Sequence, residues 1–228
     1  MLNKFLKDLQ AVSNKEKAIS LRKYFKTGKG EYGEDDVFLG ITVPDQRNIC
    51  KNYTEFSLFD IQKLLDSKVH EHRLCALFVL IHKYNKVSDQ ESIIKFYLRN
   101  TKNINNWDLV DTSAPSILGK WLLDKDRKIL SKLARSKSLW EKRISIISTY
   151  EFIKNGQFND TLSIAEILLD DKHDLIHKAV GWMLREVGKK DIKAEEVFLK
   201  KHYKNMPRTM LRYAIEKFPI GKKKYYMN

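Results

Sequence analysis

The chain has 228 residues and carries 43 Lys and Arg against 29 Asp and Glu, a formal net charge of +14 at pH 7. This excess predicts a polyanionic partner, nucleic acid first, although a ribosomal or membrane-surface protein would carry the same charge. Cys50 and Cys75 form no Cys-x-x-Cys metal motif, which suits a reduced cytosol. No run of 18 apolar residues and no apolar leader is present, so we expect a cytoplasmic protein without a membrane span.

Apolar residues recur with helical spacing almost throughout, and 9 Gly and 4 Pro interrupt them rarely. The pattern predicts an all-α fold, and the short polar connections predict a single domain over residues 1–228. We expect the last basic residues, Lys222 to Tyr226, to form a frayed end. The predicted helices cover residues 2–12, 14–26, 44–53 behind a Thr42 cap, 58–66, 69–84, 89–99, 107–123, 126–135, 139–154, 160–169, 175–189, 194–204 and 208–218.

One stretch, residues 27–36, cannot form a stable helix because it holds three glycines in six residues. Glycine lets backbone N–H groups approach an oxyanion, so a phosphate-binding loop is one interpretation. The stretch lacks the spacing of a P-loop, and four acidic residues at its far end would repel phosphate. We therefore favour a solvated glycine-rich loop.

The sequence Asn106-Trp-Asp-Leu-Val-Asp111 opens a predicted helix in the middle of the chain. Trp107 and Asp111 are four residues apart and share one helical face. A carboxylate beside an indole suits a cation or a cation-like transition state. The alternative is an ordinary helix start, capped by Asn105 or Asn106, with Trp107 packed in the core.

A repeat links residues 70–84 to residues 140–154. The spacing of 70 residues between Arg73 and Arg143 and of 75 between Trp107 and Trp182 fits two units of about 35 residues each. Such units are the size of helix pairs in solenoids, where one helix of each pair lines a concave surface. The alternative is that most of the cations are solvated and most Trp side chains lie in the core, which we expect for Trp121. Three histidines, His70, His72 and His82, form no convincing metal-ligand set. The residues predicted to share one groove are Arg73, Trp107, Asp111, Arg143, Lys178, Trp182, Arg185 and Arg212.

The sequence resembles the AlkD-like DNA alkylation repair family of HEAT-like-repeat proteins. The resemblance implies a curved α-solenoid that wraps double-stranded DNA. It also implies excision of N3-alkyladenine and N7-alkylguanine without a metal or cofactor. We expect the chain to be a monomer. The segments that carry the resemblance are Phe38-Leu-Gly-Ile-Thr-Val-Pro-Asp-Gln-Arg47, Asn106-Trp-Asp-Leu-Val-Asp111, Leu139-Trp-Glu-Lys-Arg143, His177-Lys-Ala-Val-Gly-Trp-Met-Leu-Arg-Glu186 and Leu211-Arg-Tyr-Ala-Ile-Glu216.

The resemblance also implies roles for individual residues. Asp111 resembles the catalytic carboxylate, Trp107 and Trp182 resemble the aromatic walls of the cleft, and Arg143 resembles an arginine near the DNA backbone. The chemistry is consistent, because a carboxylate stabilises the oxocarbenium-like sugar that forms when a cationic base leaves. The full DNA-binding set predicted is Tyr24, Arg73, Arg143, Lys178, Arg185 and Arg212.

Two alternatives to a glycosylase remain at this point. A non-catalytic HEAT-like protein that binds damaged or branched DNA would need the basic surface but no catalytic carboxylate. A protein–protein adaptor would use the same fold without needing a charge of +14 or the Trp–Asp pair.

Overall fold

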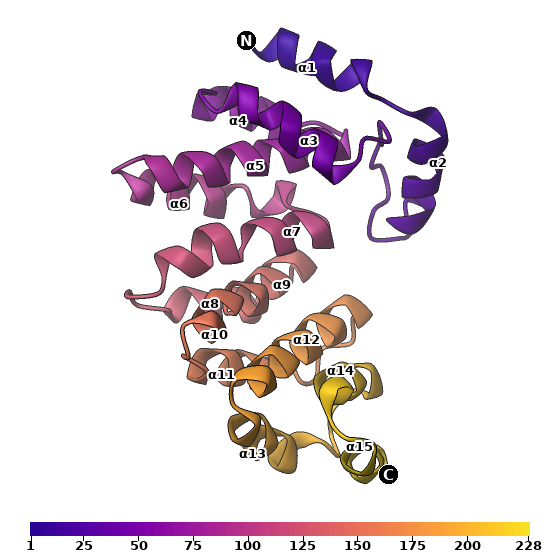
Figure 1. Ribbon diagram of the computed structural model, residues 1–228, viewed down its shortest axis with the longest axis vertical. Coiled ribbons are helices and arrows are strands. Elements are labelled where there is room, and N and C mark those ends of the chain that lie inside the picture. Colours follow the sequence, from indigo (N-terminus) through magenta and orange to yellow (C-terminus); the bar gives the residue numbers. More distant parts are fainter. The chain divides into compact units, whose positions relative to one another are not determined.

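The computed structural model describes residues 1–228, and its regular elements are all helices (Figure 1). A single parallel bridge joins Val37 to Val69. The predicted all-α class is confirmed. The elements are α1 (Leu2–Ala11), α2 (Lys15–Tyr24), α3 (Val43–Cys50), η1 (Lys51–Tyr53), α4 (Leu58–Leu65), α5 (His70–Lys86), α6 (Gln90–Arg99), η2 (Thr101–Asn103), α7 (Trp107–Ser113), η3 (Pro115–Gly119), α8 (Lys128–Ala134), α9 (Leu139–Ser148), α10 (Tyr150–Lys154), α11 (Asn159–Ile167), α12 (Asp174–Lys190), α13 (Ile192–His202), α14 (Arg208–Ala214), η4 (Ile215–Lys217) and α15 (Ile220–Met227).

The chain forms two compact units, Met1–Ser113 and Ala114–Asn228. The first unit holds α1 to α7, and the second holds η3 to α15. The expectation of a single domain over the whole chain stays a prediction. None of the helices has both the length and the apolar character that a membrane crossing requires.

In the first unit, α5 is the central helix and packs against α3, α4 and α7. Leu77 and Leu80 on α5 are fully buried, as are Ile61 on α4 and Leu109 on α7. Burial of one such side chain stabilises the fold by about 1.5–3 kcal/mol. The start of α4 is fixed by a capping box, in which Ser57 and the third helical residue exchange hydrogen bonds.

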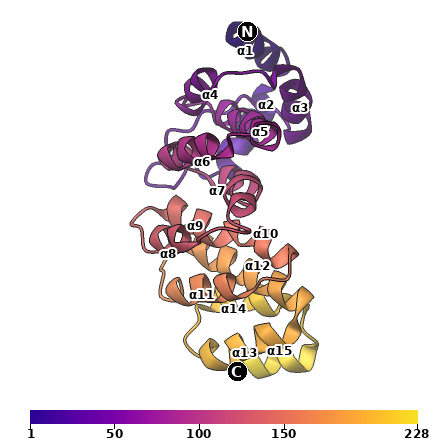
Figure 2. The same cartoon turned by 90° about the vertical axis from the view of Figure 1, so that its left-hand side faces the viewer.

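In the second unit, α12 is the central helix and packs against α9, α13 and α14. Figure 2 shows α12 between α9 and the C-terminal helices. Gly181 allows α14 to approach closely, because a Cβ atom there would lie 2.4 Å from the Met210 carbonyl oxygen. Its neighbours Ala179 and Val180 are fully buried.

Two predicted helices are each divided in the structure. The helix predicted over residues 107–123 ends at Ser113 and gives way to the π-helix η3, where the Gly119 N–H donates to the Ala114 carbonyl at 2.8 Å. Pro115 causes this break, because it has no N–H for the regular helical ladder. The helix predicted over residues 139–154 breaks at Thr149, whose hydroxyl donates to the Ile146 carbonyl at 2.7 Å.

The expectation of a frayed C-terminal end is wrong. Residues 222–226 belong to α15, and Tyr226 is only 3% exposed. Its ring meets Tyr203 edge to face, with centroids 5.4 Å apart, and Phe218 at 5.8 Å. The aromatic side chains of this basic segment therefore anchor it, which its charge alone did not indicate.

We expect Gly181→Ala to lower the free energy of unfolding by about 1–3 kcal/mol, because the new methyl group overpacks the α12–α14 contact. Chemical denaturation measures this change. Gly221→Ala on α15 is the matched control, since no atom lies within 4 Å of its Cβ position. The control should be neutral or slightly stabilising, and equal losses in the two variants would contradict the close approach.

Candidate active site

Helix α7 presents Trp107 and Asp111 one turn apart on a single side. The helix begins where the Asn106 side-chain oxygen accepts the Trp107 N–H at 2.8 Å. Leu109 and Val110 are fully buried and hold α7 in the core, whereas Trp107 and Asp111 are both half-buried. The segment is thus both a helix start that Asn106 caps and a helical face that Trp107 and Asp111 share, so the two interpretations do not exclude each other.

The Trp107 indole is held on three sides by residues near the end of α2 and in the glycine-rich loop. Phe25 stacks on it, with centroids 5.3 Å apart and planes at 18°. Tyr24 meets it edge to face at 5.9 Å. The indole N–H, which can only donate, is hydrogen-bonded to the Tyr32 hydroxyl. The orientation of the ring is thus set before any ligand arrives.

Beneath this ring lies a buried group of four charges. His70 is 2% exposed, with Nε2 2.8 Å from Asp108 Oδ2 and Nδ1 3.2 Å from Asp36 Oδ2. Arg73 donates from Nη2 to the same Asp36 oxygen at 2.7 Å. Two carboxylates thus face an imidazole and a guanidinium, and the four charges balance when His70 is protonated.

The pKa values of this group follow from its geometry. Burial by itself lowers the pKa of His70, but hydrogen bonds and charge from Asp108 and Asp36 outweigh it and raise the pKa to about 9. Burial raises the pKa of Asp36, yet His70 and Arg73 lower it further than burial raises it. His70 is therefore an imidazolium at neutral pH.

An aromatic cluster of Phe25, Phe38 and Trp107 connects this charge to the indole, and Phe25 itself lies 4.8 Å from His70 between ring centroids. Phe38 stacks on His70 at 4.7 Å and 20°, and Phe25 stacks on Phe38 at 5.1 Å and 18°. Trp107 joins the cluster by stacking on Phe25. The ring faces are electron-rich and stabilise the buried imidazolium through cation–π attraction.

Not all of the predicted cationic residues are on the surface. The expectation that Arg73 faces an open groove is wrong, because its side chain is 3% exposed and also donates to the Ser67 carbonyl at 2.9 Å. A buried guanidinium requires such partners, and here they include Asp36. Arg143 is buried too, at 5% exposed, and donates to the Leu175 carbonyl of α12 at 2.6 Å.

The other predicted cations of the second unit are more accessible. Lys178 forms an ion pair with Asp174 at 2.7 Å and keeps 41% of its side chain exposed. Arg185 pairs with Glu216, and its side chain is 17% exposed. Arg212 lies on the exposed side of α14.

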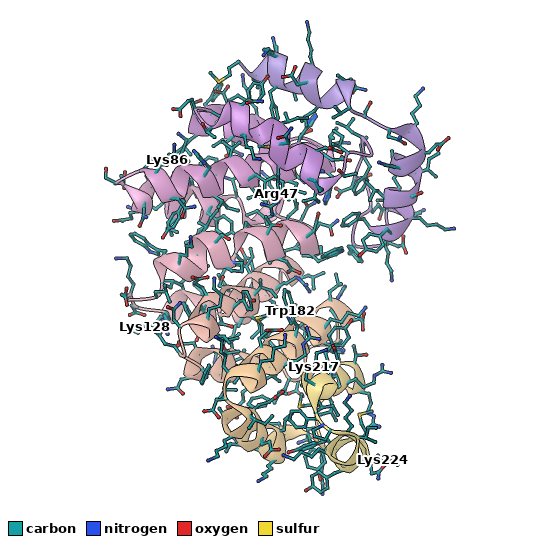
Figure 3. The ribbon with its side chains drawn as sticks, viewed as in Figure 1. Arg47, Lys86, Lys128, Trp182, Lys217 and Lys224 are labelled. Atoms are coloured by element: carbon teal, nitrogen blue, oxygen red, sulfur yellow. The ribbon has the colours of Figure 1, made fainter.

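Trp182 lies on α12 and is half-buried (Figure 3). Its indole N–H donates to Glu186 Oε1 at 3.1 Å, and Tyr150 lies 6.0 Å from it between centroids. The ring is therefore fixed within its own unit. Trp121, expected in the core, is only half-buried, with the Lys125 ammonium 4.2 Å above its ring.

The glycine-rich loop uses its own carboxylates. The Gly28 N–H donates to Glu31 and the Gly30 N–H to Glu34, both at 2.8 Å. These donors are taken, which favours the solvated-loop interpretation over the phosphate-binding one. The loop nevertheless contributes Tyr32 and Asp36 to the site, which the sequence interpretation did not predict.

The structure also adds three residues outside the loop that the sequence interpretation missed at this site. The sequence pattern gave Asp108 no role at the site, and it raised His70 only as a possible metal ligand. Phe25 gave no signal beyond being apolar near a helix end. No group of three or more His, Cys, Asp or Glu side chains is placed to hold a metal ion.

Comparisons with known proteins agree on one family and one fold. The family model described as DNA alkylation repair enzyme matches residues 5–218. A predicted DNA alkylation repair enzyme from Enterococcus faecalis superimposes with a TM-score of 0.75 at 18% identity, covering 91% of this chain and 97% of that one. AlkD2 from Streptococcus mutans gives a TM-score of 0.59 at 18% identity, covering 90% of this chain and 99% of that one. No protein of curated function matches the sequence.

The ion pairs of His70 with Asp36 and Asp108 should make the free energy of unfolding depend on pH. The pKa of His70 is raised from 6.5 to about 9 in the folded chain. The contribution of the protonated imidazole to folding stability is therefore complete below pH 6.5 and is lost as the pH rises through 9. We expect the difference in unfolding free energy between wild type and His70→Gln to shrink by about 3 kcal/mol between pH 6.5 and 9.5. Denaturant titrations at several pH values measure it, and a pH-independent difference would contradict the charged pair.

Tyr32→Phe should alter the surroundings of Trp107 without unfolding the chain, because the ring stays and only the acceptor of the indole N–H is lost. Two difference spectra isolate the emission of Trp107. The spectrum of Trp107→Phe is subtracted from that of wild type, and the spectrum of the Tyr32→Phe/Trp107→Phe double variant is subtracted from that of Tyr32→Phe. We expect a changed intensity or emission maximum. Identical difference spectra would show that Tyr32 does not hold the indole.

Proposed function

The chain belongs to the DNA alkylation repair enzyme family, and from this we propose that it is a monofunctional DNA glycosylase. Its substrates are cationic alkylated purines, N3-alkyladenine and N7-alkylguanine, in double-stranded DNA. The reaction hydrolyses the N-glycosidic bond and needs no cofactor. The curved solenoid of HEAT-like repeats and the monomeric state belong to the same proposal.

The observation that carries the proposal is the pairing of Trp107 and Asp111 on α7. Both are half-buried on a helix whose other side is fixed in the core by Leu109 and Val110. Asp111 is thus a carboxylate on a rigid element beside an indole of fixed orientation. Rigid placement of charge where charge develops is the most effective single means of catalysis.

The chemistry proceeds without a strong acid. Alkylation at N3 or N7 makes the purine cationic, so the bond between C1′ and the base breaks with both electrons going to the base. The sugar becomes oxocarbenium-like, and Asp111 stabilises that positive charge. Asp111 also orients a water molecule whose oxygen bonds to C1′, and the released proton passes to the carboxylate or solvent. The Trp107 ring adds cation–π stabilisation.

DNA contact in this proposal comes from exposed groups. Tyr24, Lys178 and Arg212 are accessible, whereas the buried Arg73 and Arg143 act by holding neighbouring elements in place. Trp182 keeps the role that the resemblance implies for it, and Arg185 stays in the predicted DNA-binding set. Each exposed cation that meets a phosphate should contribute to the salt dependence of binding.

The test is release of N7-methylguanine and N3-methyladenine from methylated duplex DNA at low salt. We expect Asp111→Asn to lower the rate by about 100-fold or more while keeping most DNA affinity. Asp126→Asn is the matched control, because Asp126 is exposed and pairs only with Lys128. Release by Asp111→Asn at the wild-type rate would exclude the proposed role of this carboxylate.

A second candidate, a non-catalytic protein that binds damaged or branched DNA, is favoured by one observation. Phe25 covers one face of the Trp107 indole, so that face does not contact a substrate. This candidate predicts binding that weakens steeply with salt and no base release by the wild type. Lys178→Gln and Arg212→Gln should each reduce the salt slope by about one. Salt-independent binding would exclude both candidates.

A further inference from the structure

A cavity of about 500 Å³ lies in the first unit, beside the aromatic cluster, and no role has yet been assigned to it. It is bounded by α2, by the segment that leads into α3, and by the start of α7. Its volume is within the range of small-ligand pockets, roughly 300–1,000 Å³. The side chains that form its walls include Leu21, Tyr24, Phe25, Phe38, Val43 and Trp107.

The cavity exists because α2 touches the rest of the unit mainly near its two ends. Near its start, the Asn14 N–H donates to the Leu39 carbonyl at 2.9 Å. Gly40 lies against this end, with φ +79° and a Cβ position only 2.0 Å from the Asn14 carbonyl oxygen. Past its other end, Phe25 stacks on Phe38. No residue of α2 itself is buried, so the helix spans the cavity rather than filling it.

Several polar groups around the cavity already have protein partners. Glu71 accepts the backbone N–H groups of the adjoining segment, with Gly40 at 2.8 Å, and Gln46 donates to the Ile41 carbonyl at 2.9 Å. His70 is held by two carboxylates. A ligand therefore finds few free hydrogen-bonding groups in the walls and is recognised by flat apolar contact instead.

The surroundings of the cavity indicate an anionic chain that carries planar groups. Lys17 lines it, and Arg22 and Lys23 are exposed on the same helix. Aromatic rings and cations together are the means by which proteins bind unpaired nucleotides, because rings stack on bases of any sequence and cations meet the phosphates. Trp107 belongs both to this cavity and to the proposed site on α7.

We propose that this cavity receives one unpaired nucleobase of a bound DNA duplex. The base stacks against the aromatic walls, and the flanking phosphates lie near the cations of α2. Because the walls offer few free polar groups, the cavity should accept bases of any identity. The proposal rests on the DNA binding in the proposed function but not on its catalytic step.

The experiment compares two duplexes that differ only in a single bulged base, 2-aminopurine, each carrying a terminal fluorophore for anisotropy titration. We expect wild-type protein to bind the bulged duplex roughly 5- to 150-fold more tightly than the paired one. We also expect the 2-aminopurine emission to change on binding, because the base enters an aromatic environment.

Val43→Trp should remove this preference by filling the cavity from its rim, and Val37→Trp is the matched control. The two valines are similarly exposed, at 44% and 48%, and Val37 lines a different hollow. Because a new indole could itself stack on a base, Tyr24→Ala provides a second variant. Tyr24 is 64% exposed, so its truncation should preserve folding while weakening the preference.

The outcomes separate the two proposals. Equal affinity of wild type for both duplexes, or an undiminished preference in Val43→Trp and Tyr24→Ala, would overturn the cavity assignment. Base release from methylated DNA, measured on the same proteins, decides the glycosylase independently. If the protein releases bases but does not prefer the bulged duplex, only the cavity proposal is excluded. If it prefers the bulged duplex but releases no base, only the glycosylase proposal is excluded.

Discussion

His70 carries a positive charge inside the first unit, and three parts of that unit meet on it. Asp36 comes from the end of the glycine-rich loop, Asp108 from the start of α7, and Arg73 lies one turn further along α5. A buried charge is costly unless partners compensate it. Each carboxylate therefore fixes its own segment, and loss of either would leave an imidazolium without its balance.

This arrangement determines how the aromatic residues are placed. The bond from Asp108 to His70 fixes the first turn of α7, and with it the backbone of Trp107. The aromatic cluster then fixes the indole ring, because Phe25 stacks on both Trp107 and Phe38. The same contacts limit the site, since Phe25 occupies one indole face. A rigid indole beside Asp111 favours catalysis, whereas its covered face favours a binding role, and base release distinguishes between them.

The glycine-rich loop links α2 to both the Trp107 indole and the buried His70. Its glycines allow the chain to turn, and its own glutamates satisfy two of its backbone donors. The loop then returns to deliver Tyr32 to the indole and Asp36 to His70. Helix α2 and the segment that leads into α3 line the cavity, and the loop joins them, so changes in the N-terminal third of the chain should affect the site as strongly as changes on α7.

The sequence by itself determined the helical class, most helix positions, the family, and the presence of Trp107 and Asp111 on one helical face. The helical class, the helix positions and the shared face depend on periodicity, caps and local spacing, which act over a few residues, whereas the family was indicated by the resemblance of segments along the whole chain. It did not determine the π-turn at Pro115, the buried state of Arg73, the anchored end around Tyr226, or the roles of Phe25, Tyr32 and His70. Apart from the π-turn, which follows from Pro115, these features depend on contacts between residues up to 82 positions apart, such as Phe25 with Trp107. Only the tertiary structure brings such residues together. The sequence around a single polar or aromatic residue does not predict which residue it will contact, because burial and pairing arise only when the whole unit packs.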